Sequence, residues 1–247
     1  MTANTELPTT EIEPGLVLRG VPAGLRLADF KLIAFDMDST LINIECVDEI
    51  AAEAGRKAEV AAITEAAMRG EITDYKHSLR ERVALLKGVP VRAMQAVYDQ
   101  RLQLNPGAAD LVRACKDAGL KVLLVSGGFT FFTDRIKARL GIDFARSNVL
   151  ETEASADGEV LSGRMVDQAW GDICDGNEKR RTVLEVATLL GISPRQVIAM
   201  GDGANDLPMM GVAGLSVAYQ AKPAVRAQAM VAINSGGLDR LLQVVRP

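Results

Sequence analysis

Short apolar runs bounded by polar residues alternate with segments of helical periodicity through much of the 247-residue chain. The first run, residues 31–36 (KLIAFD), is typical of a strand buried on both faces of a parallel sheet. Similar signals predict strands at 121–125, 144–150 and 196–200, a D-G hairpin turn at 156–158, and helices at 108–118, 129–140, 178–190 and near 206. This alternation predicts an α/β fold with a doubly wound, mainly parallel sheet.

A helical block interrupts the alternation after the first strand. From residue 46 to about 104, apolar residues recur at three- and four-residue steps, which predicts about four helices. The expected organisation is an N-terminal extension at 1–30, a core at 31–43 and 106–247, and a helical insertion at 44–105. Residues 1–15 are rich in Thr, Glu and Pro and are expected to form a flexible arm, whereas 16–30 carry no clear signal.

Composition and charge argue against nucleic-acid-binding and membrane proteins. Lys and Arg number 28 against 32 Asp and Glu, a net charge of −4, and no basic stretch suggests nucleic-acid binding. The apolar runs are far shorter than the ~20 residues that span a bilayer, so no membrane partner is expected. The first fifteen residues lack the features of a secretory signal, and we therefore expect a cytoplasmic protein. Oligomeric state stays open between monomer and homodimer.

Cysteine and histidine are scarce. Cys46, Cys115 and Cys174 are far apart and odd in number, which fits reduced thiols better than disulfides. With no C-x-x-C pair and His77 as the single histidine, a zinc site or a histidine-activated nucleophile is disfavoured unless His77 serves. Carboxylates remain as the expected catalytic groups.

Polar residues cluster where three predicted strands end, at 36–40, 126–128 and 201–206. Ligands bind beyond the carboxyl ends of the strands in open α/β sheets, so these clusters are expected to converge. Convergence would bury like charges together, which is costly without a cation. The acids concerned are Asp36, Asp38, Asp202 and Asp206. Oxygen-only ligands favour Mg²⁺, which typically also takes a substrate phosphate oxygen.

The neighbouring residues suit a phosphate group, because glycines let backbone N–H groups approach it closely and a serine adds a hydroxyl. These residues are Ser126, Gly127, Gly128 and Gly203. Lys179, near the start of a predicted helix, could supply a fixed positive charge. Asp36 is a candidate nucleophile that would accept a phosphoryl group, and Asp38 is a candidate proton shuttle.

Four ordered motifs resemble those of the haloacid dehalogenase superfamily and cover nearly all of residues 31–210. They are DMDST at 36–40, SGG at 126–128, Lys179 and GDGAND at 201–206. Longer stretches, such as 36–55 and 78–88, are similar to the branch of that superfamily that hydrolyses phosphoserine. The resemblance implies a Rossmannoid core with an inserted helical cap of the C1 type. It also implies Mg²⁺-dependent hydrolysis of O-phospho-L-serine to L-serine and phosphate through an aspartyl-phosphate, the last step of serine biosynthesis.

The resemblance further implies roles for individual residues. Asp36 would attack phosphorus, and Asp38 would protonate the departing serine oxygen and then activate water. Mg²⁺ would be held by the Asp36 carboxylate, the Asp38 main-chain carbonyl and Asp202, with Asp206 orienting from nearby. The residues that would hold the phosphate or bond beside it are Ser126, Gly127, Lys179 and Asn205.

Inside the insertion, which matches the cap of this family, Glu45 would meet the substrate ammonium group and Arg82 its carboxylate. Met68 and Tyr75 would exclude water. This assignment agrees with the chemistry of phosphoserine, because Arg can bind a carboxylate through two hydrogen bonds and Glu can pair with an amine.

Two alternatives stay open. A phosphatase or phosphotransferase for another small phosphomonoester, such as phosphohomoserine, would differ in the distance from Glu45 and Arg82 to the phosphate site. A receiver-like signalling module also pairs clustered acids with Mg²⁺, a phosphorylated Asp and a Lys. Against the receiver stand the D-x-D placement and the long helical insertion, which a receiver does not need.

Overall fold

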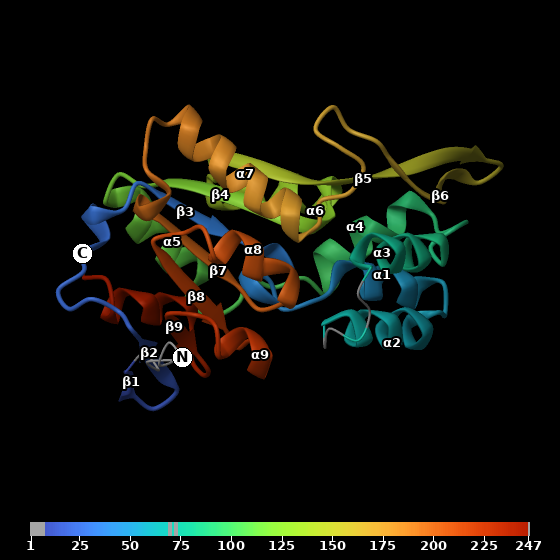
Figure 1. Ribbon diagram of the computed structural model, residues 1–247. Coiled ribbons are helices and arrows are strands. Elements are labelled where there is room, and N and C mark those ends of the chain that lie inside the picture. The colour runs from blue at the N-terminus through green and yellow to red at the C-terminus, as the bar shows by residue number, and fades with distance from the viewer. Residues whose placement is uncertain (1–7, 69–70, 72–73, 247) are drawn as a thin grey trace.

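The computed structural model describes residues 8–68, 71 and 74–246. Within these residues, nine strands form one sheet in the order β1-β2-β9-β8-β7-β3-β4-β5-β6 (Figure 1). Neighbouring strands from β9 to β5 pair in parallel, while β1, β2 and β6 pair antiparallel at the two ends of the order. The predicted mainly parallel α/β sheet is therefore confirmed. The strands are β1 (Thr9–Glu13), β2 (Leu16–Arg19), β3 (Leu32–Phe35), β4 (Lys121–Phe129), β5 (Phe144–Ser155), β6 (Gly158–Val166), β7 (Val197–Gly201), β8 (Leu215–Tyr219) and β9 (Val231–Ile233).

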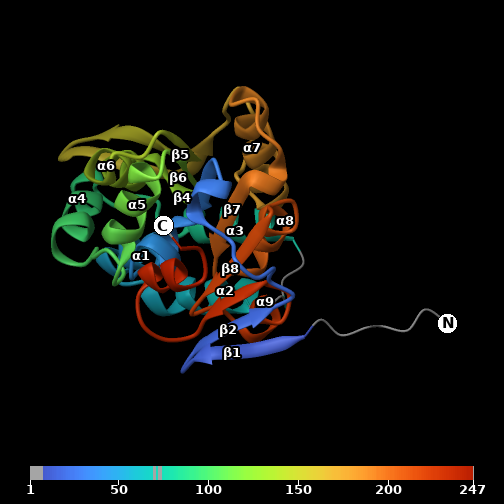
Figure 2. The ribbon, with the colours of Figure 1, turned by 90° about the vertical axis from the view of Figure 1, so that its left-hand side faces the viewer.

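The central strands are buried on both faces, which explains their uninterrupted apolar sequence. In β3, Ile33 and Phe35 belong to one core cluster, and Leu32 and Ala34 belong to the other. Successive side chains of a strand point to opposite faces, so one strand serves two cores. Helices α5 and α6 cover the first face, and α7, α8 and α9 cover the second (Figure 2). Their bounds are α5 (Ala108–Asp117), α6 (Thr130–Leu140), α7 (Gly176–Leu189), α8 (Leu207–Met210) and α9 (Pro223–Arg226).

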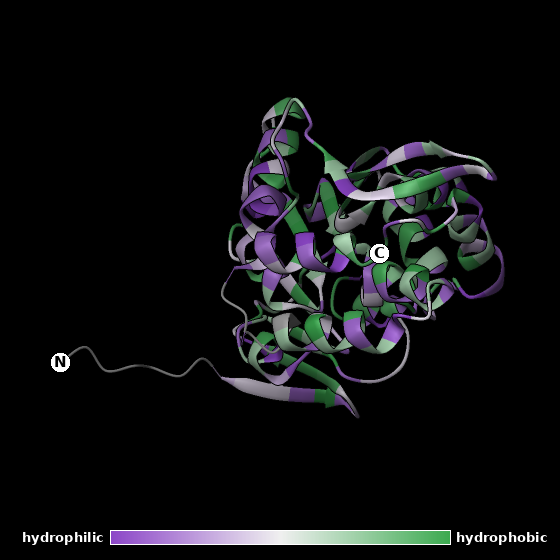
Figure 3. Cartoon of the chain, turned by 90° about the vertical axis from the view of Figure 1, so that its right-hand side faces the viewer, coloured by the Kyte–Doolittle hydropathy of each residue, from purple (hydrophilic) through white to green (hydrophobic). Residues whose placement is uncertain are grey.

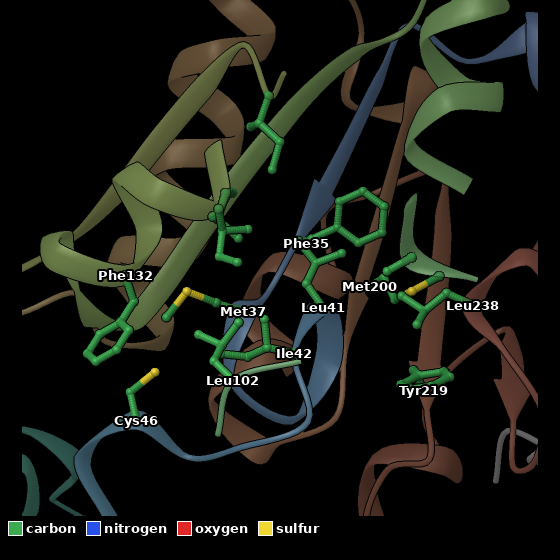
Figure 4. Close-up of a cluster of buried hydrophobic side chains, with 14 of the residues drawn as sticks. Phe35, Met37, Leu41, Ile42, Cys46, Leu102, Phe132, Met200, Tyr219 and Leu238 are labelled. Carbon is green, nitrogen blue, oxygen red and sulfur yellow. The ribbon is translucent and has the colours of Figure 1, made fainter. Parts of the chain in front are cut away.

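Apolar side chains also anchor the loop that follows β3. Met37 and Leu41, on either side of the short polar stretch 38–40, are fully buried in the first core cluster together with Phe35 and Met200 (Figure 4). This packing fixes the backbone of the loop while its polar side chains remain available to a site at the edge of the sheet.

The helical insertion forms four helices in the described part of the chain, as predicted. They are α1 (Cys46–Glu53), α2 (Lys57–Met68), α3 (Tyr75–Ala84) and α4 (Val91–Gln100). We call them the four-helix block; it lies beyond one end of the sheet (Figure 1). The two chain segments that enter and leave it are tied together, because Asn105 Nδ2 donates to the carbonyls of Thr40 and Ile42 at 2.8 and 3.0 Å. Among the described residues, no helix has the length and apolar character needed to cross a membrane.

The predicted hairpin at 156–158 is confirmed as the β5–β6 turn, and it makes a second link to the four-helix block. The backbone N–H of Gly88 donates to the Leu161 carbonyl at 2.8 Å, and the Leu161 N–H donates to Val89 at 2.8 Å. The segment between α3 and α4 is therefore held by β6 as well as by the block itself.

The prediction of a flexible arm at 1–15 is wrong for the described residues 8–15; residues 1–7 lie outside the described part. Strands β1 and β2 form a hairpin, and β2 pairs with β9 so that Leu16 lies opposite Ile233. Every residue of β1 is exposed, and the strand is largely hydrophilic in Figure 3. Because it buries no apolar face, β1 lacks the alternation by which a strand is recognised in a sequence.

Candidate active site

Asp36 lies at the carboxyl end of β3, buried among main-chain groups. Its N–H donates to the Met200 carbonyl at 3.0 Å, and its Oδ1 accepts from the Met37 N–H at 2.7 Å. The following loop turns tightly, with Ser39 at a φ of 58° and the Ile42 N–H donating to the Met37 carbonyl at 3.0 Å. The loop thereby holds the Asp36 carboxylate in a fixed orientation.

Lys179 links two of the predicted site acids. It lies in the first turns of α7, which the Asp175 side chain caps by accepting from the Glu178 N–H at 2.8 Å. Lys179 Nζ is 2.7 Å from Oδ1 of Asp36 and 2.7 Å from Oδ1 of Asp206, and its side chain is fully buried. Burial opposes the charged form, but the two carboxylates outweigh it and hold the pKa of Lys179 well above its usual range.

Asp206 bonds to the backbone of the turn after β7 as well as to Lys179. Its Oδ2 accepts from the N–H groups of Asp202 and Gly203 at 3.0 and 2.9 Å. A Cβ on Gly201 would overlap the Asp206 carboxyl group, so the glycine is needed for this close approach. Asp206 therefore shapes the turn after β7 as well as facing Lys179.

Three carboxylates meet closely enough to share a cation. Asp36, Asp202 and Asp206 each offer an oxygen within 4.8 Å of the others. Thr40 Oγ1 donates to Oδ1 of Asp202 at 2.8 Å, which fixes that carboxylate from the loop after β3. The donor set is entirely oxygen, as Mg²⁺ prefers.

The electrostatics of the site also fit a bound cation. Burial and the Asp206 charge raise the pKa of Asp36 to about 7, against the lowering effect of Lys179. Burial and the charges of Asp206 and Asp36 raise the pKa of Asp202 well above its usual range. These carboxylates are therefore costly to ionise together, and a divalent cation would remove that cost.

Asp38 lies in a different environment from Asp36. Its Oδ2 accepts from the Cys46 N–H at 3.2 Å, while its buried Oδ1 has no hydrogen-bond partner in the described part of the chain. Burial and the charges of Glu45 and Asp36 raise its pKa well above the usual range. Asp38 is thus suited to carry a proton that it can give to a bound molecule.

The C-terminal part of β4, where its pairing with β5 is irregular, presents small residues to the site. Ser126 is buried, and its Oγ accepts from the Gly128 N–H at 2.8 Å. Asn148 on β5 donates from Nδ2 to the Gly127 carbonyl at 2.8 Å and accepts from the Cys174 N–H at 2.8 Å. Asn148 therefore fixes the peptide group after Gly127. Asn148 was not among the predicted site residues, although a buried Asn inside a strand is itself unusual.

The residues described so far, at the ends of the strands, form one wall of the site. The four-helix block, with Glu45 directly before it, forms the other wall. Ser39 Oγ donates to Glu45 Oε1 at 2.6 Å, and burial raises the pKa of Glu45 against this hydrogen bond. Arg82, which is 4% exposed, donates from Nη1 to Thr64 Oγ1 at 3.1 Å. The hydroxyl of Tyr75 lies against Gly127, and burial raises the pKa of Tyr75 to about 12.

A cavity of about 410 Å³ joins the two walls. Of the predicted site residues, its lining includes Asp36, Asp38, Glu45, Tyr75, Arg82, Ser126, Gly127, Asp202 and Asn205. Lys179 and Asp206 do not line this cavity; Lys179 contacts the lining residue Asp36, and Asp206 contacts Lys179. Met68 ends α2, but its side chain lies outside the described part of the structure. The cavity thus combines a carboxylate cluster, the glycine-rich end of β4, the acid Glu45 and the buried Arg82.

Known proteins resemble this chain over most of its length. The phosphoserine phosphatase of Polaromonas sp. (strain JS666) is 77% identical over 96% of this chain and 99% of its own. The phosphoserine phosphatase of Albidiferax ferrireducens is 70% identical over 96% of this chain and 99% of its own. Both alignments therefore include nearly the whole chain and nearly the whole of each relative.

Solved structures resemble the fold as well. A phosphoserine phosphatase with an analogue of the phospho-aspartyl intermediate has a TM-score of 0.80 and 38% identity, covering 88% of this chain and 99% of its own. A substrate-bound phosphoserine phosphatase complex has a TM-score of 0.78 and 37% identity over 88% and 99% of the two chains. The family model of the haloacid dehalogenase-like hydrolases matches residues 30–214, which include both walls of the cavity. The chain belongs to the haloacid dehalogenase-like hydrolases.

Proposed function

We propose that this chain is a Mg²⁺-dependent phosphoserine phosphatase that hydrolyses O-phospho-L-serine to L-serine and phosphate. The observation that carries the proposal is the single cavity in which Asp36 and Asp38 face Glu45 and Arg82. The first pair suits phosphoryl transfer, and the second pair suits the ammonium and carboxylate of an amino acid. The high identity to phosphoserine phosphatases over nearly the whole chain supports the same substrate.

In the first step, Asp36 attacks phosphorus. Its Oδ1 already accepts from Met37 and contacts Lys179, so Oδ2 is the oxygen left to form the new P–O bond. The bond from phosphorus to the serine oxygen breaks, and Asp38 gives that oxygen its proton. The products of this step are serine and an aspartyl-phosphate on Asp36.

In the second step, Asp38 accepts a proton from water as the water attacks phosphorus. The P–O bond to Asp36 breaks, and phosphate and the free carboxylate are released. The raised pKa of Asp38 supports both halves of this cycle, because the group can be protonated before the first step and regenerated by the second.

The Asp36 carboxylate, the Asp38 main-chain carbonyl and Asp202 would hold Mg²⁺, with Asp206 orienting from nearby. Bound there, the cation would neutralise charge on the phosphate and on the carboxylates around it. Lys179 supports the same charge balance, since a phosphoryl group on Asp36 would lie beside its ammonium group.

Substrate binding is divided between the two walls. Ser126, Gly127, Lys179 and Asn205 would hold or flank the phosphate. Glu45 would bind the ammonium group and Arg82 the carboxylate, and Met68 and Tyr75 would exclude water. In this assignment residues 44–105 act as a cap over a core formed by 31–43 and 106–247, with 1–30 as an extension. The last step of serine biosynthesis, in the cytoplasm, is the proposed physiological setting.

The alternatives predict different substrates. Membership of a hydrolase family and the four-helix block favour an enzyme over a receiver-like module. Phosphate release from phosphoserine, phosphothreonine and phosphohomoserine, each measured with Mg²⁺ and with a chelator, tests which phosphomonoester is the substrate and whether release depends on the metal. We expect Mg²⁺-dependent release that is fastest with phosphoserine and is abolished in Asp36→Asn with the fold retained. Faster release from phosphohomoserine would overturn the substrate assignment, and an active Asp36→Asn would overturn the covalent mechanism.

A further inference from the structure

A chain of hydrogen bonds runs through three helices of the four-helix block and ends on Arg82. Thr64 Oγ1 accepts from Arg82 Nη1 at 3.1 Å and lies 2.7 Å from Oδ1 of Asp48, to which it donates. Asp48 belongs to α1, Thr64 to α2 and Arg82 to α3. The guanidinium group is therefore tied to both neighbouring helices.

Thr64 has the bonding capacity that this position needs. A hydroxyl offers one hydrogen and two acceptor sites, so it can donate to one neighbour while it accepts from another. The Val60 carbonyl one turn earlier is also within reach at 3.1 Å, but Asp48 is closer and charged. With its proton directed to Asp48, Thr64 presents a lone pair to Arg82.

The hydrogen bond between Arg82 and Thr64 is buried, which favours a single orientation of the guanidinium group. Thr64 and Arg82 are each 4% exposed, and both line the cavity. Asp48 does not line that cavity, so it acts on the cavity through Thr64. An arginine side chain has several rotatable bonds, and a fixed hydrogen bond at one end restricts the directions in which the guanidinium group can point.

We propose that Thr64 and Asp48 are positioning residues that orient Arg82 and so determine selectivity for substrates with a carboxylate. The inference rests on the proposed function, in which Arg82 binds the carboxylate of phosphoserine. The hydrogen bonds of Thr64 go to Asp48, Val60 and Arg82, and neither Asp36 nor Asp38 takes part in them, so Thr64 and Asp48 are assigned no role in phosphoryl transfer. They affect only the binding of the substrate carboxylate.

The experiment compares phosphoserine with phosphoethanolamine, which has the same phosphate and ammonium groups but no carboxylate. The measured quantity is the ratio of kcat/KM for the two substrates. Thr64→Val keeps the shape of the side chain and removes both hydrogen bonds, and we expect it to lower this ratio about tenfold. Thr64→Ser keeps the hydroxyl and should restore the ratio. Asp48→Asn should lower it in the same direction by about threefold.

A double variant separates positioning from a general effect on folding. In an Arg82→Ala background, Thr64→Val should leave the ratio unchanged, because the group that it positions is gone. An equal loss on both substrates, failure of Thr64→Ser to restore the ratio, or a further decrease in the Arg82→Ala background would each overturn the proposal. A wild-type protein with no preference for phosphoserine over phosphoethanolamine would instead overturn the proposed function on which it rests.

Discussion

The hydroxyl oxygen of Tyr75 occupies the space that a Cβ on Gly127 would need. Tyr75 begins α3 of the four-helix block, and Gly127 lies in the C-terminal part of β4. The absence of a side chain at position 127 therefore lets the two walls of the cavity meet. This contact joins α3 to β4. The ion pairs of Lys76 and Arg80 with Asp172 join α3 to the segment between β6 and α7.

Gly127→Ala tests the contact directly. The backbone at this position is not in the left-handed region, so alanine should be tolerated locally and the added methyl group should displace Tyr75. We expect kcat/KM for phosphoserine to fall at least about tenfold with little change in the melting temperature. The overlap is with the hydroxyl, whereas the ring carbon Cζ would be 3.2 Å away. Gly127→Ala with Tyr75→Phe should therefore recover activity relative to Gly127→Ala alone, and no recovery would contradict this explanation.

Lys179→Met tests the buried ion pairs. The substitution leaves the carboxylates of Asp36 and Asp206 without their shared cation, and breaking such a pair typically costs about 3–5 kcal/mol. We expect a loss of this size in the free energy of unfolding, measured by urea denaturation at pH 7 with a chelator present, as well as a loss of turnover. Adding Asp206→Asn removes one of the two charges and should recover part of the stability. Equal stabilities of the wild type and Lys179→Met would show that Lys179 does not compensate these acids.

Cation binding should stabilise the folded chain. A ligand that binds only the folded state raises stability by mass action, and Asp36 and Asp202 come together as a ligand set only in that state. At a Mg²⁺ concentration about 100 times Kd, we expect the melting temperature of the wild type to rise by roughly 5 °C. Asp202→Asn should lose most of this rise, and KCl at the same ionic strength should not reproduce it. An equal rise in the variant would place the cation elsewhere.

The carboxylates of the site could be predicted from the sequence because each follows an apolar strand within a few residues. Parallel strands bring their carboxyl ends to one edge of the sheet. The strand pattern alone was therefore sufficient to predict that Asp36 and Asp202 lie close together. The four helices of the insertion were also evident, because apolar residues recur there at helical steps.

Other parts of the site depend on contacts that no local pattern records. Thr64 is an ordinary polar residue of a helix, and Asn148 is a polar residue of a strand. Each matters to the site because of the residue it contacts elsewhere in the chain, which is Arg82 for Thr64 and Gly127 for Asn148. Lys179 was predicted to hold the phosphate, but no local pattern predicts its ion pair with Asp36, which depends on how α7 packs on the sheet. Strand β1 was missed for another reason, since a fully exposed strand has no apolar alternation.

The Asp172 ion pairs give a stability difference that depends on pH. Hydrogen bonding to Lys76 lowers the pKa of Asp172, so the group is stabilised in its charged form in the folded state. A lowered pKa adds stability above the pKa of the unfolded chain, near 3.9, and that stability is lost as pH falls through the folded pKa. The Asp172 side chain is 37% exposed, which limits the contribution at pH 7 to below about 1 kcal/mol. We therefore expect Asp172→Asn to be less stable than the wild type at pH 7 and equally stable near pH 2, as measured by urea denaturation. Asp167→Asn, at an exposed neighbouring acid, is the matched control, and a difference between the wild type and Asp172→Asn that persisted at pH 2 would contradict the ion-pair explanation.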